Sequence, residues 1–515
     1  MLRQQKATVF FQRSRITLAS SFPTASKIAK MAAENGSARS QQDDTSQIKQ
    51  TRETRPPSVY FPLGYKEAAY QWWTSVTPPM VERKVLSFIP TLREAADSAS
   101  NPNASSATPD PLGTRVWRRT MVQLSGKNRA LNEVCVEKIG DKTEETLVVV
   151  HGYGAGLGFF YKNLEPMSRM PGLKLYALDM LGMGNSSRPA FRIHAKDREQ
   201  QVVEAEDWFI DALEEWRQKR NIERFTLLGH SLGGYLAVSY ALKYPGHLKK
   251  LILASPVGIP EDPYAVNASM PEPDVSTLEN EFTQDQQQVT ENGHDSAAAA
   301  KAAAAAAASP KAGGGAPSAP KRPIPSWLVW LWDANVSPFS IIRMTGPLGP
   351  RFVSGWTSRR FSHLPAAESR ALHDYAFSIF KQKGSGEYAL AYILAPGAYA
   401  RRPVINRIQD VGRQPLPGSP AKKETGFPIV FMYGENDWMD VAGGLASEEK
   451  LKRAKEEALA RATDEEKRSE NGSVKVVIVP KAGHHLYLDN AEFFNDALQK
   501  EMDDVYATSK KNNDH

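Results

Sequence analysis

The sequence has 515 residues, of which 41% are hydrophobic and 24% charged, so a wholly disordered chain is excluded. Lys and Arg number 64 against 58 Asp and Glu, and the net charge of +6 is too small for a dedicated nucleic-acid binder of this length. The single cysteine, Cys135, excludes an intrachain disulfide and a zinc site built from several cysteines. No apolar run approaches the roughly 18 residues that a membrane-spanning helix needs.

The first 33 residues differ in composition from the rest of the chain. Residues 1–33 are rich in Ser and Thr, contain six basic residues and precede the first acidic residue, Glu34. This pattern is typical of a mitochondrial transit peptide, and a disordered basic tail is the other interpretation. We therefore expect a mitochondrial protein, peripheral to the inner membrane. A cytosolic or lipid-droplet form is the alternative, because translation from Met31 would remove the signal.

Two internal segments lack the pattern of a folded domain. Residues 34–59 are polar and charged, and we predict a disordered linker. Residues 260–323 contain an acidic, Gln-rich stretch, an alanine tract from Ala297 to Ala308 and a Ser/Pro/Gly-rich end, which predict a disordered insert. The remaining predicted parts are a core at 60–259 and 416–505, a cap or lid at 324–415 and a disordered tail at 506–515.

Short apolar runs that end at turn residues predict the buried strands of a mostly parallel sheet. These runs are Leu147–Val150, Leu173–Leu178, Phe225–Leu228, Leu251–Ala254, Ile429–Tyr433 and Val474–Val479. Val116–Leu124 and Asn132–Ile139 predict an antiparallel start. Helical patterns at 198–219, Leu232–Tyr244 and 491–505 alternate with or follow the strands, which favours an α/β fold.

The sequence Gly229-His230-Ser231-Leu232-Gly233 follows a predicted strand and opens a predicted helix. In that context G-x-S-x-G predicts a nucleophile elbow, in which Ser231 is the nucleophile. The turn is too tight for side chains at its flanks, so Gly229 and Gly233 are required on steric grounds. The start of the helix also favours developing negative charge.

A serine hydroxyl needs a base, and in this chain order the acid and then the histidine follow the nucleophile. His484 comes just after the last predicted strand and is the preferred base, with His485 as the alternative. Asp437 follows the preceding strand and is the preferred acid, with Asp440 as the alternative. The acid orients the imidazole and stabilises the imidazolium.

Two backbone N–H groups are expected to bind the oxyanion. Leu232 follows the nucleophile directly, and Tyr153 lies in the glycine-rich loop after the first predicted parallel strand. The segment Asp179–Ser186 reads as a structural turn beside the site. This chemistry needs neither a metal ion nor an organic cofactor.

These motifs together resemble the α/β-hydrolases, and the resemblance extends beyond the elbow. It includes Trp332–Arg343, Gly346–Pro350, Ser385–Tyr388, Pro396–Arg401 and His484–Asp489. The sequence looks like the group that contains the lipid-droplet lipase coactivator, the N-acyl-phospholipid lipase and the fungal cardiolipin-specific deacylase. The resemblance implies a mostly parallel eight-stranded sheet with a helical cap inserted before the last two strands.

The resemblance also implies lipid acyl esters as substrates. We expect a serine phospholipase that removes a fatty-acyl chain, with cardiolipin as the substrate and monolysocardiolipin as the product. The alternatives are a CoA-dependent lysophosphatidic acid or lysophospholipid acyltransferase and a non-catalytic lipid-binding lipase regulator. Some relatives are described as acyltransferases with an H-x4-D motif, here His484 to Asp489, although Asp489 also fits a helix cap.

The predicted cap is basic. Residues 324–413 contain eleven basic and five acidic residues, and three tryptophans lie within Trp327–Trp332. Tryptophan and arginine together favour peripheral contact with an anionic lipid surface, and an ordinary core helix with solvated charges is the other interpretation. We therefore expect a phospholipid substrate and a membrane surface as partners, and no nucleic acid. Protein partners are not predicted.

Overall fold

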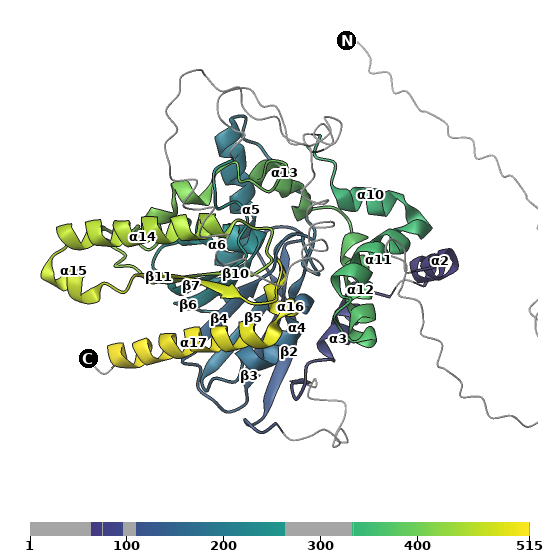
Figure 1. Cartoon of the computed structure of the whole chain (residues 1–515), viewed down its shortest axis with the longest axis horizontal. Coiled ribbons are helices and arrows are strands. Elements are labelled where there is room, and N and C mark those ends of the chain that lie inside the picture. Colours follow the sequence, from purple (N-terminus) through teal and green to yellow (C-terminus); the bar gives the residue numbers. More distant parts are fainter. Residues whose placement is uncertain (1–62, 75, 96–109, 263–331, 333, 514–515) are drawn as a thin grey trace, which may run out of the picture. The chain divides into compact units, whose positions relative to one another are not determined.

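A computed structural model describes residues 63–74, 76–95, 110–262, 332 and 334–513 (Figure 1). The predicted transit peptide at 1–33, the linker at 34–59 and nearly all of the insert at 260–323 lie outside the described residues. No helix in the described ranges is both long and apolar enough to cross a membrane.

Nine strands from the described part of the chain form the central sheet, in the order β1-β2-β3-β5-β4-β6-β7-β10-β11. They are β1 (Arg93–Glu94), β2 (Arg115–Gln123), β3 (Ala130–Lys138), β4 (Glu145–Val150), β5 (Leu173–Leu178), β6 (Phe225–His230), β7 (Leu248–Ala254), β10 (Pro428–Gly434) and β11 (Ser473–Val479). The β2–β3 and β3–β5 pairs are antiparallel and every other pair is parallel. All eight predicted strands are present. The predicted count was one too low, because β1 has only two residues and leaves no apolar run.

The central parallel strands β4, β5, β6, β7 and β10 are buried on both faces, whereas the edge strand β11 is partly exposed. Along β4, Leu147 and Val149 belong to one hydrophobic cluster while Val148 and Val150 belong to the other. Because successive side chains of a strand point to opposite faces, a continuous apolar run is what such a strand requires. The helices α5 (Arg198–Lys219), α6 (Leu232–Lys243) and α14 (Val441–Arg461) lie on one side, and α4 (Tyr161–Met167) and α17 (Ala491–Asn513) on the other (Figure 1).

The predicted helical cap lies between β7 and β10, as the fold class requires. It contains α10 (Pro338–Met344), α11 (Gly349–Arg360), α12 (Ala366–Phe380) and α13 (Leu390–Ile393), and the hairpin β8 (Pro415–Leu416) to β9 (Ser419–Lys423) follows it. Two N-terminal helices, α2 (Tyr65–Trp73) and α3 (Pro78–Leu86), pack against cap helices α11 and α12. The helices at the start of the predicted core, α2 and α3, therefore pack on the cap.

The remaining helices within the described ranges are short. They are α15 (Asp464–Ser469), α16 (Leu486–Asp489) and the 3-10 helices η1 (Leu157–Phe160), η2 (Gly346–Leu348), η3 (Gly386–Ala389), η4 (Val404–Asn406) and η5 (Ile408–Asp410).

The C-terminal end corrects one prediction. A disordered tail was expected at 506–515, but α17 continues to Asn513. Its apolar face continues through Met502 and Val505, which are 1% and 5% exposed, and Tyr506 packs against the same cluster. Lys510 and Lys511 in the last turn suit the negative end of the helix dipole. The predicted helix ended too early, at residue 505, because the polar composition of residues 506–515 was read as a disordered tail.

Candidate active site

Ser231 lies in a strained turn between β6 and α6. Its backbone has φ 52° and ψ −118°, a region that non-glycine residues rarely adopt. A Cβ on Gly229 would lie 2.4 Å from the carbonyl oxygen of Gly233, and one on Gly233 would lie 2.5 Å from that of His151. The two glycines are therefore required by close backbone contacts, for the steric reason that the motif suggested.

His484 lies next to Ser231 in the loop between β11 and α16. Its Nε2 is 3.0 Å from Ser231 Oγ, which is hydrogen-bonding distance for a base and a nucleophile. Ser231 is 5% exposed and His484 is 1% exposed. The loop is held in place because His230 Nε2 lies 3.0 Å from the His484 carbonyl oxygen and donates a hydrogen bond to it.

The neighbouring His485 faces away from this pair. Its Nδ1 accepts a hydrogen bond of 3.0 Å from Arg360 Nε on cap helix α11. Burial holds the pKa of both His485 and His230 well below the ordinary value, so both rings are neutral. Of the two adjacent histidines, the structure places His484 beside Ser231.

The structure distinguishes between the two candidate acids. Asp437 Oδ1 lies 3.3 Å from His484 Nδ1, and the Asp437 side chain is fully buried. The N–H groups of Gly434 and Met439 donate hydrogen bonds to the same carboxylate, at 3.3 and 3.0 Å. Asp440 instead caps α14, where its Oδ1 accepts a hydrogen bond of 2.8 Å from Ala442 N–H.

Ser255 is a site residue that the sequence analysis did not identify. Its hydroxyl donates a hydrogen bond of 2.5 Å to Asp437 Oδ2, and its Oγ lies 2.6 Å from His484 Nδ1. The Nδ1–H of His484 therefore has two acceptors, Asp437 directly and Ser255 Oγ. Ser255 directly follows β7, which lies between β6 and β10 in the sheet, so its position at the carboxyl end of a parallel strand was the available signal.

Two backbone segments lie close to Ser231 at the predicted oxyanion site, the start of α6 and the glycine-rich loop. Leu232 is the first residue of α6, and the N–H groups of a first helical turn have no intrahelical acceptor. The glycine-rich loop approaches the elbow closely, since a Cβ on Gly152 would lie 2.9 Å from Ser231 Cβ. Tyr153 is the next residue in this loop. The structure therefore brings both candidate segments to Ser231.

Asp489 connects the histidine loop to the cap. Its Oδ2 accepts a hydrogen bond of 3.0 Å from Gly483 N–H, and its Oδ1 pairs with Arg360 at 2.8 Å. The alternative that Asp489 caps the C-terminal helix is wrong, because Asn490 has that position and accepts from Phe493 N–H. Asp489, the aspartate of the H-x4-D motif, thus links Gly483, the residue before His484, to Arg360 of helix α11.

Aromatic side chains cover the site. The Tyr153 ring stacks on Phe339 of α10 with centroids 5.2 Å apart, and Phe339 stacks on Phe380 of α12 at 4.5 Å. The Trp438 ring lies 4.9 Å from the His484 ring. The cap and the loop after β10 therefore both contribute aromatic side chains near the site.

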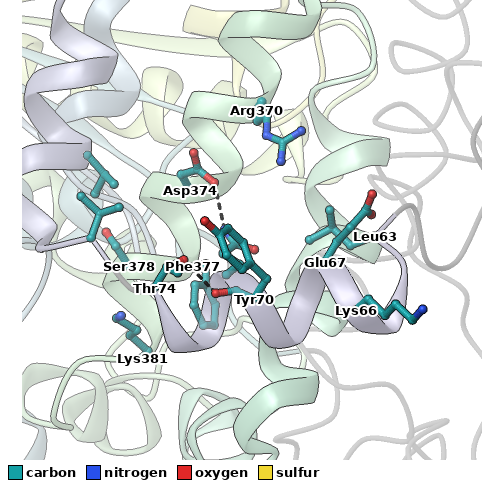
Figure 2. A pocket seen from close by; sticks show the side chains of 13 residues that line it. Leu63, Lys66, Glu67, Tyr70, Thr74, Arg370, Asp374, Phe377, Ser378 and Lys381 are labelled. Atoms are coloured by element: carbon teal, nitrogen blue, oxygen red, sulfur yellow. Dashed lines mark hydrogen bonds between the residues drawn. The ribbon is translucent and has the colours of Figure 1, made fainter. Parts of the chain in front are cut away.

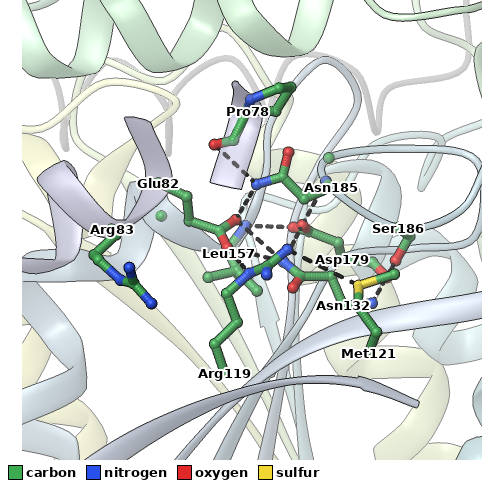
Figure 3. Close-up of polar contacts among 12 residues, drawn as sticks. Pro78, Glu82, Arg83, Arg119, Met121, Asn132, Leu157, Asp179, Asn185 and Ser186 are labelled. Atoms are coloured by element: carbon green, nitrogen blue, oxygen red, sulfur yellow. Dashed lines mark hydrogen bonds and ion pairs between the residues drawn. The ribbon is translucent and has the colours of Figure 1, made fainter. Parts of the chain in front are cut away.

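A buried polar network binds the backbone at Leu157, directly after the glycine-rich loop (Figure 3). Asp179 accepts hydrogen bonds of 2.7 Å from the N–H groups of Leu157 and Asn185, which agrees with the predicted structural turn. Glu82 of α3 accepts from Arg119 Nε at 2.7 Å and from Tyr375 Oη of α12 at 3.1 Å. Burial, followed by repulsion from Asp179, raises the pKa of Glu82 to about 7.

The raised pKa of Glu82 predicts a pH-dependent stability. The folded state holds the Glu82 proton more tightly than the unfolded state, so the free energy of unfolding should fall as pH rises from about 4.5 to about 7. Glu82→Gln should flatten this fall by an amount on the order of 3 kcal/mol. Urea unfolding at pH 5, 6, 7 and 8 checks this. The exposed Glu67→Gln is the control, and parallel curves for the wild type and Glu82→Gln would contradict the prediction.

No group of three or more His, Cys, Asp or Glu side chains within the described ranges is arranged to hold a metal ion.

Comparisons with known proteins agree with this geometry. The model of the α/β-hydrolase fold matches residues 145–491. The chain is 29% identical over 441 residues to a probable 1-acylglycerol-3-phosphate O-acyltransferase of Oryza sativa, covering 84% of this chain and 82% of that protein. It is 27% identical over 389 residues to the human (lyso)-N-acylphosphatidylethanolamine lipase, covering 75% and 86%.

A bromoperoxidase structure from Bacillus anthracis matches with a TM-score of 0.43 and 14% identity, covering 75% of this chain and 99% of that one. The two similar sequences agree with the predicted resemblance to the lipase-coactivator group. Because the family model spans more than half of the sequence, the chain belongs to the α/β-hydrolase family.

Proposed function

We propose that this α/β-hydrolase is a serine lipid acyl-hydrolase that removes a fatty-acyl chain from a phospholipid. The observation that carries the proposal is the contact between Ser231 Oγ and His484 Nε2, with Asp437 and Ser255 at Nδ1 of the same ring. Similarity to a lipase named for N-acyl phospholipids supports a lipid substrate.

In the first half of the reaction, Ser231 Oγ attacks the ester carbonyl carbon while His484 Nε2 takes the hydroxyl proton. The N–H groups of Leu232 and Tyr153 bind the oxyanion that forms. The intermediate collapses when the bond to the alkoxy oxygen breaks. His484 donates its proton to that oxygen, and the lysolipid leaves an acyl group on Ser231.

In the second half, water attacks the acyl-Ser231 carbonyl and gives a proton to His484. The Ser231 Oγ–carbon bond then breaks, the proton returns to Ser231, and a fatty acid is released. Asp437 stabilises the imidazolium in both halves without taking its proton.

Ser255 is a positioning residue in this scheme. When His484 acts as a base through Nε2, its Nδ1 carries the proton, and Ser255 Oγ accepts that Nδ1–H while its own hydroxyl donates to Asp437. This arrangement fixes the tautomer and the ring plane that the reaction needs.

Ser255→Ala should lower kcat about tenfold, because a hydrogen bond within a charged chain is lost. In an Asp437→Asn background, the same change should have a much smaller effect, since the two residues act through one imidazole. Steady-state kinetics of the four proteins measure the coupling. Ser255→Gly controls for the positive φ of 46° at this position. Equal factors in both backgrounds would show that Ser255 acts elsewhere.

An acyltransferase is the second candidate, because similar proteins carry that name. The chemistry differs in both halves. In the first half, Ser231 Oγ attacks acyl-CoA and the CoA thiol leaves with a proton from His484. In the second half, a lysolipid hydroxyl replaces water at acyl-Ser231.

We further propose cardiolipin as the substrate and a mitochondrial, peripheral location. The composition of residues 1–33 and the resemblance to a cardiolipin deacylase support both. Exposed side chains on α2 and the cap helices support contact with a lipid surface, including Trp73 at 81% and Met344 at 74% exposure. Residues 327–331 of the tryptophan-rich segment Trp327–Trp332 lie outside the described residues.

Lipid mass spectrometry tests the proposal. The full chain and its Ser231→Ala variant are mixed with cardiolipin, other phospholipids and lysophosphatidic acid, with and without acyl-CoA. Serine-dependent release of monolysocardiolipin and fatty acid is the expected result. Acylated lysolipid that forms only with acyl-CoA would favour the transferase, and turnover of no lipid would contradict both candidates and favour a lipase regulator.

A further inference from the structure

A cavity away from Ser231 lies between N-terminal helix α2 and cap helix α12. Its volume is about 510 Å³, which is within the range of pockets that hold one small ligand. Figure 2 shows Tyr70 from α2 beside Phe377 from α12. None of the residues that line it belongs to the group around Ser231.

The wall of this cavity offers apolar surface. Val81 of α3 and Phe377 of α12 line it and are only 5% and 4% exposed, and Val76 and Leu63 add further aliphatic side chains. Contact with such a surface favours a hydrocarbon chain, because apolar area is removed from water. The ligand is therefore expected to have an apolar part.

The charged group that distinguishes the cavity is Lys381, the residue that follows α12. Its side chain lines the cavity and is partly buried, with the ammonium 5.6 Å from the centroid of the Phe377 ring. Its side chain makes no ion pair or hydrogen bond with any residue that the structure describes. Burial alone lowers the pKa of Lys381. A partly buried cation without a counter-charge is stabilised by an anion.

The carboxylates beside the cavity already have partners. Asp374 accepts from Gln71 Nε2 at 2.9 Å and pairs with Lys84 at 3.5 Å. Glu67 accepts a hydrogen bond of 3.0 Å from Gly64 N–H. Two more cations, Lys66 and Arg370, line the same space. Three cations thus line the cavity together with two carboxylates, one of which pairs with Lys84, so the balance of charge on the wall is positive.

We propose that this cavity binds the anion of a free long-chain fatty acid. The acyl chain contacts Val81 and Phe377, and the carboxylate is held by Lys381, whereas Arg370 lies at the opposite end of the cavity (Figure 2). The volume suits a single chain rather than a multi-chain phospholipid. The proposal does not depend on the proposed catalytic function, because binding requires no reaction at Ser231.

The test is direct binding of a fluorescent long-chain fatty acid, below its micelle concentration, to the full-length Ser231→Ala protein. Saturable one-site binding is expected. Lys381→Gln should raise the dissociation constant about tenfold, since a charge-assisted contact is lost. Lys383→Gln, on a nearby exposed lysine that does not line the cavity, should leave the constant unchanged.

Two further arms decide between ligand chemistries. The matching fatty alcohol should bind to the wild-type protein more weakly than the acid does, because it lacks the carboxylate. For the same reason, the alcohol should bind to the wild type and to Lys381→Gln with the same dissociation constant. Arg370→Gln, at the opposite and exposed end of the cavity, should leave the dissociation constant of the acid nearly unchanged, and thermal melting checks that each variant is folded. Equal affinity for acid and alcohol, no effect of Lys381→Gln, or binding to anionic vesicles but not to the monomeric acid would overturn the proposal.

Discussion

Replacing Ser231 with alanine should lower kcat for the proposed lipid deacylation by about 10⁵–10⁶-fold, because Ser231 Oγ is the hydroxyl that lies 3.0 Å from His484 Nε2. The effect should lie in kcat, since the ester carbonyl still fits beside Leu232 N–H. Fatty-acid release by the wild type and the variant, measured on the same lipid, gives the ratio.

His484→Ala provides the matching control. Because the nucleophile and its base act as one unit, the loss in His484→Ala should approach that in Ser231→Ala, and the double variant should lose little more. His485→Ala should retain far more activity, since its Nδ1 contacts Arg360 instead. Full activity in His484→Ala with loss in His485→Ala would reverse the assignment of the base.

Gly233→Ala should damage both stability and activity. The new Cβ would lie 2.5 Å from the His151 carbonyl oxygen and 2.9 Å from that of Val150, and both belong to backbone that cannot move freely. We expect a loss of about 1–3 kcal/mol in the free energy of unfolding. The shift also displaces the glycine-rich loop next to Ser231, so kcat should fall about 100-fold.

Urea unfolding and steady-state kinetics measure the two effects of Gly233→Ala. Gly64→Ala is the matched control, because the nearest atom to its added Cβ is a Glu67 side-chain oxygen at 3.6 Å, an ordinary contact. A Gly233→Ala protein with wild-type stability and activity would show that the elbow tolerates a side chain at this flank.

The central strands were predictable because the middle of the sheet is covered on both faces. Each buried strand is then a short apolar run, and Leu173–Leu178 matches β5 at both ends. The elbow was predictable because close backbone contacts at Gly229 and Gly233 leave a pattern in the sequence. The two-residue strand β1 has no such pattern, since a parallel bridge to β2 is made by backbone groups alone.

The acid and its supporting hydroxyl were harder to predict. Asp437 and Asp440 are three residues apart, and the sequence favoured Asp437 only by its offset from the strand. The choice depends on which carboxylate the N–H groups of Gly434 and Met439 hold near His484. Ser255 was missed because a serine after a strand is an ordinary turn residue, and its contact with Asp437 spans 182 positions.

The proposed chemistry depends above all on Ser231 as the activated nucleophile. A fluorophosphonate probe, which forms a covalent bond with activated serines, followed by peptide mass spectrometry tests this directly. We predict one adduct, on Ser231, that forms rapidly in the wild type, slowly in His484→Ala and not at all in Ser231→Ala. Folded wild-type protein that reacts at a different serine, or that does not react, would contradict this role of Ser231.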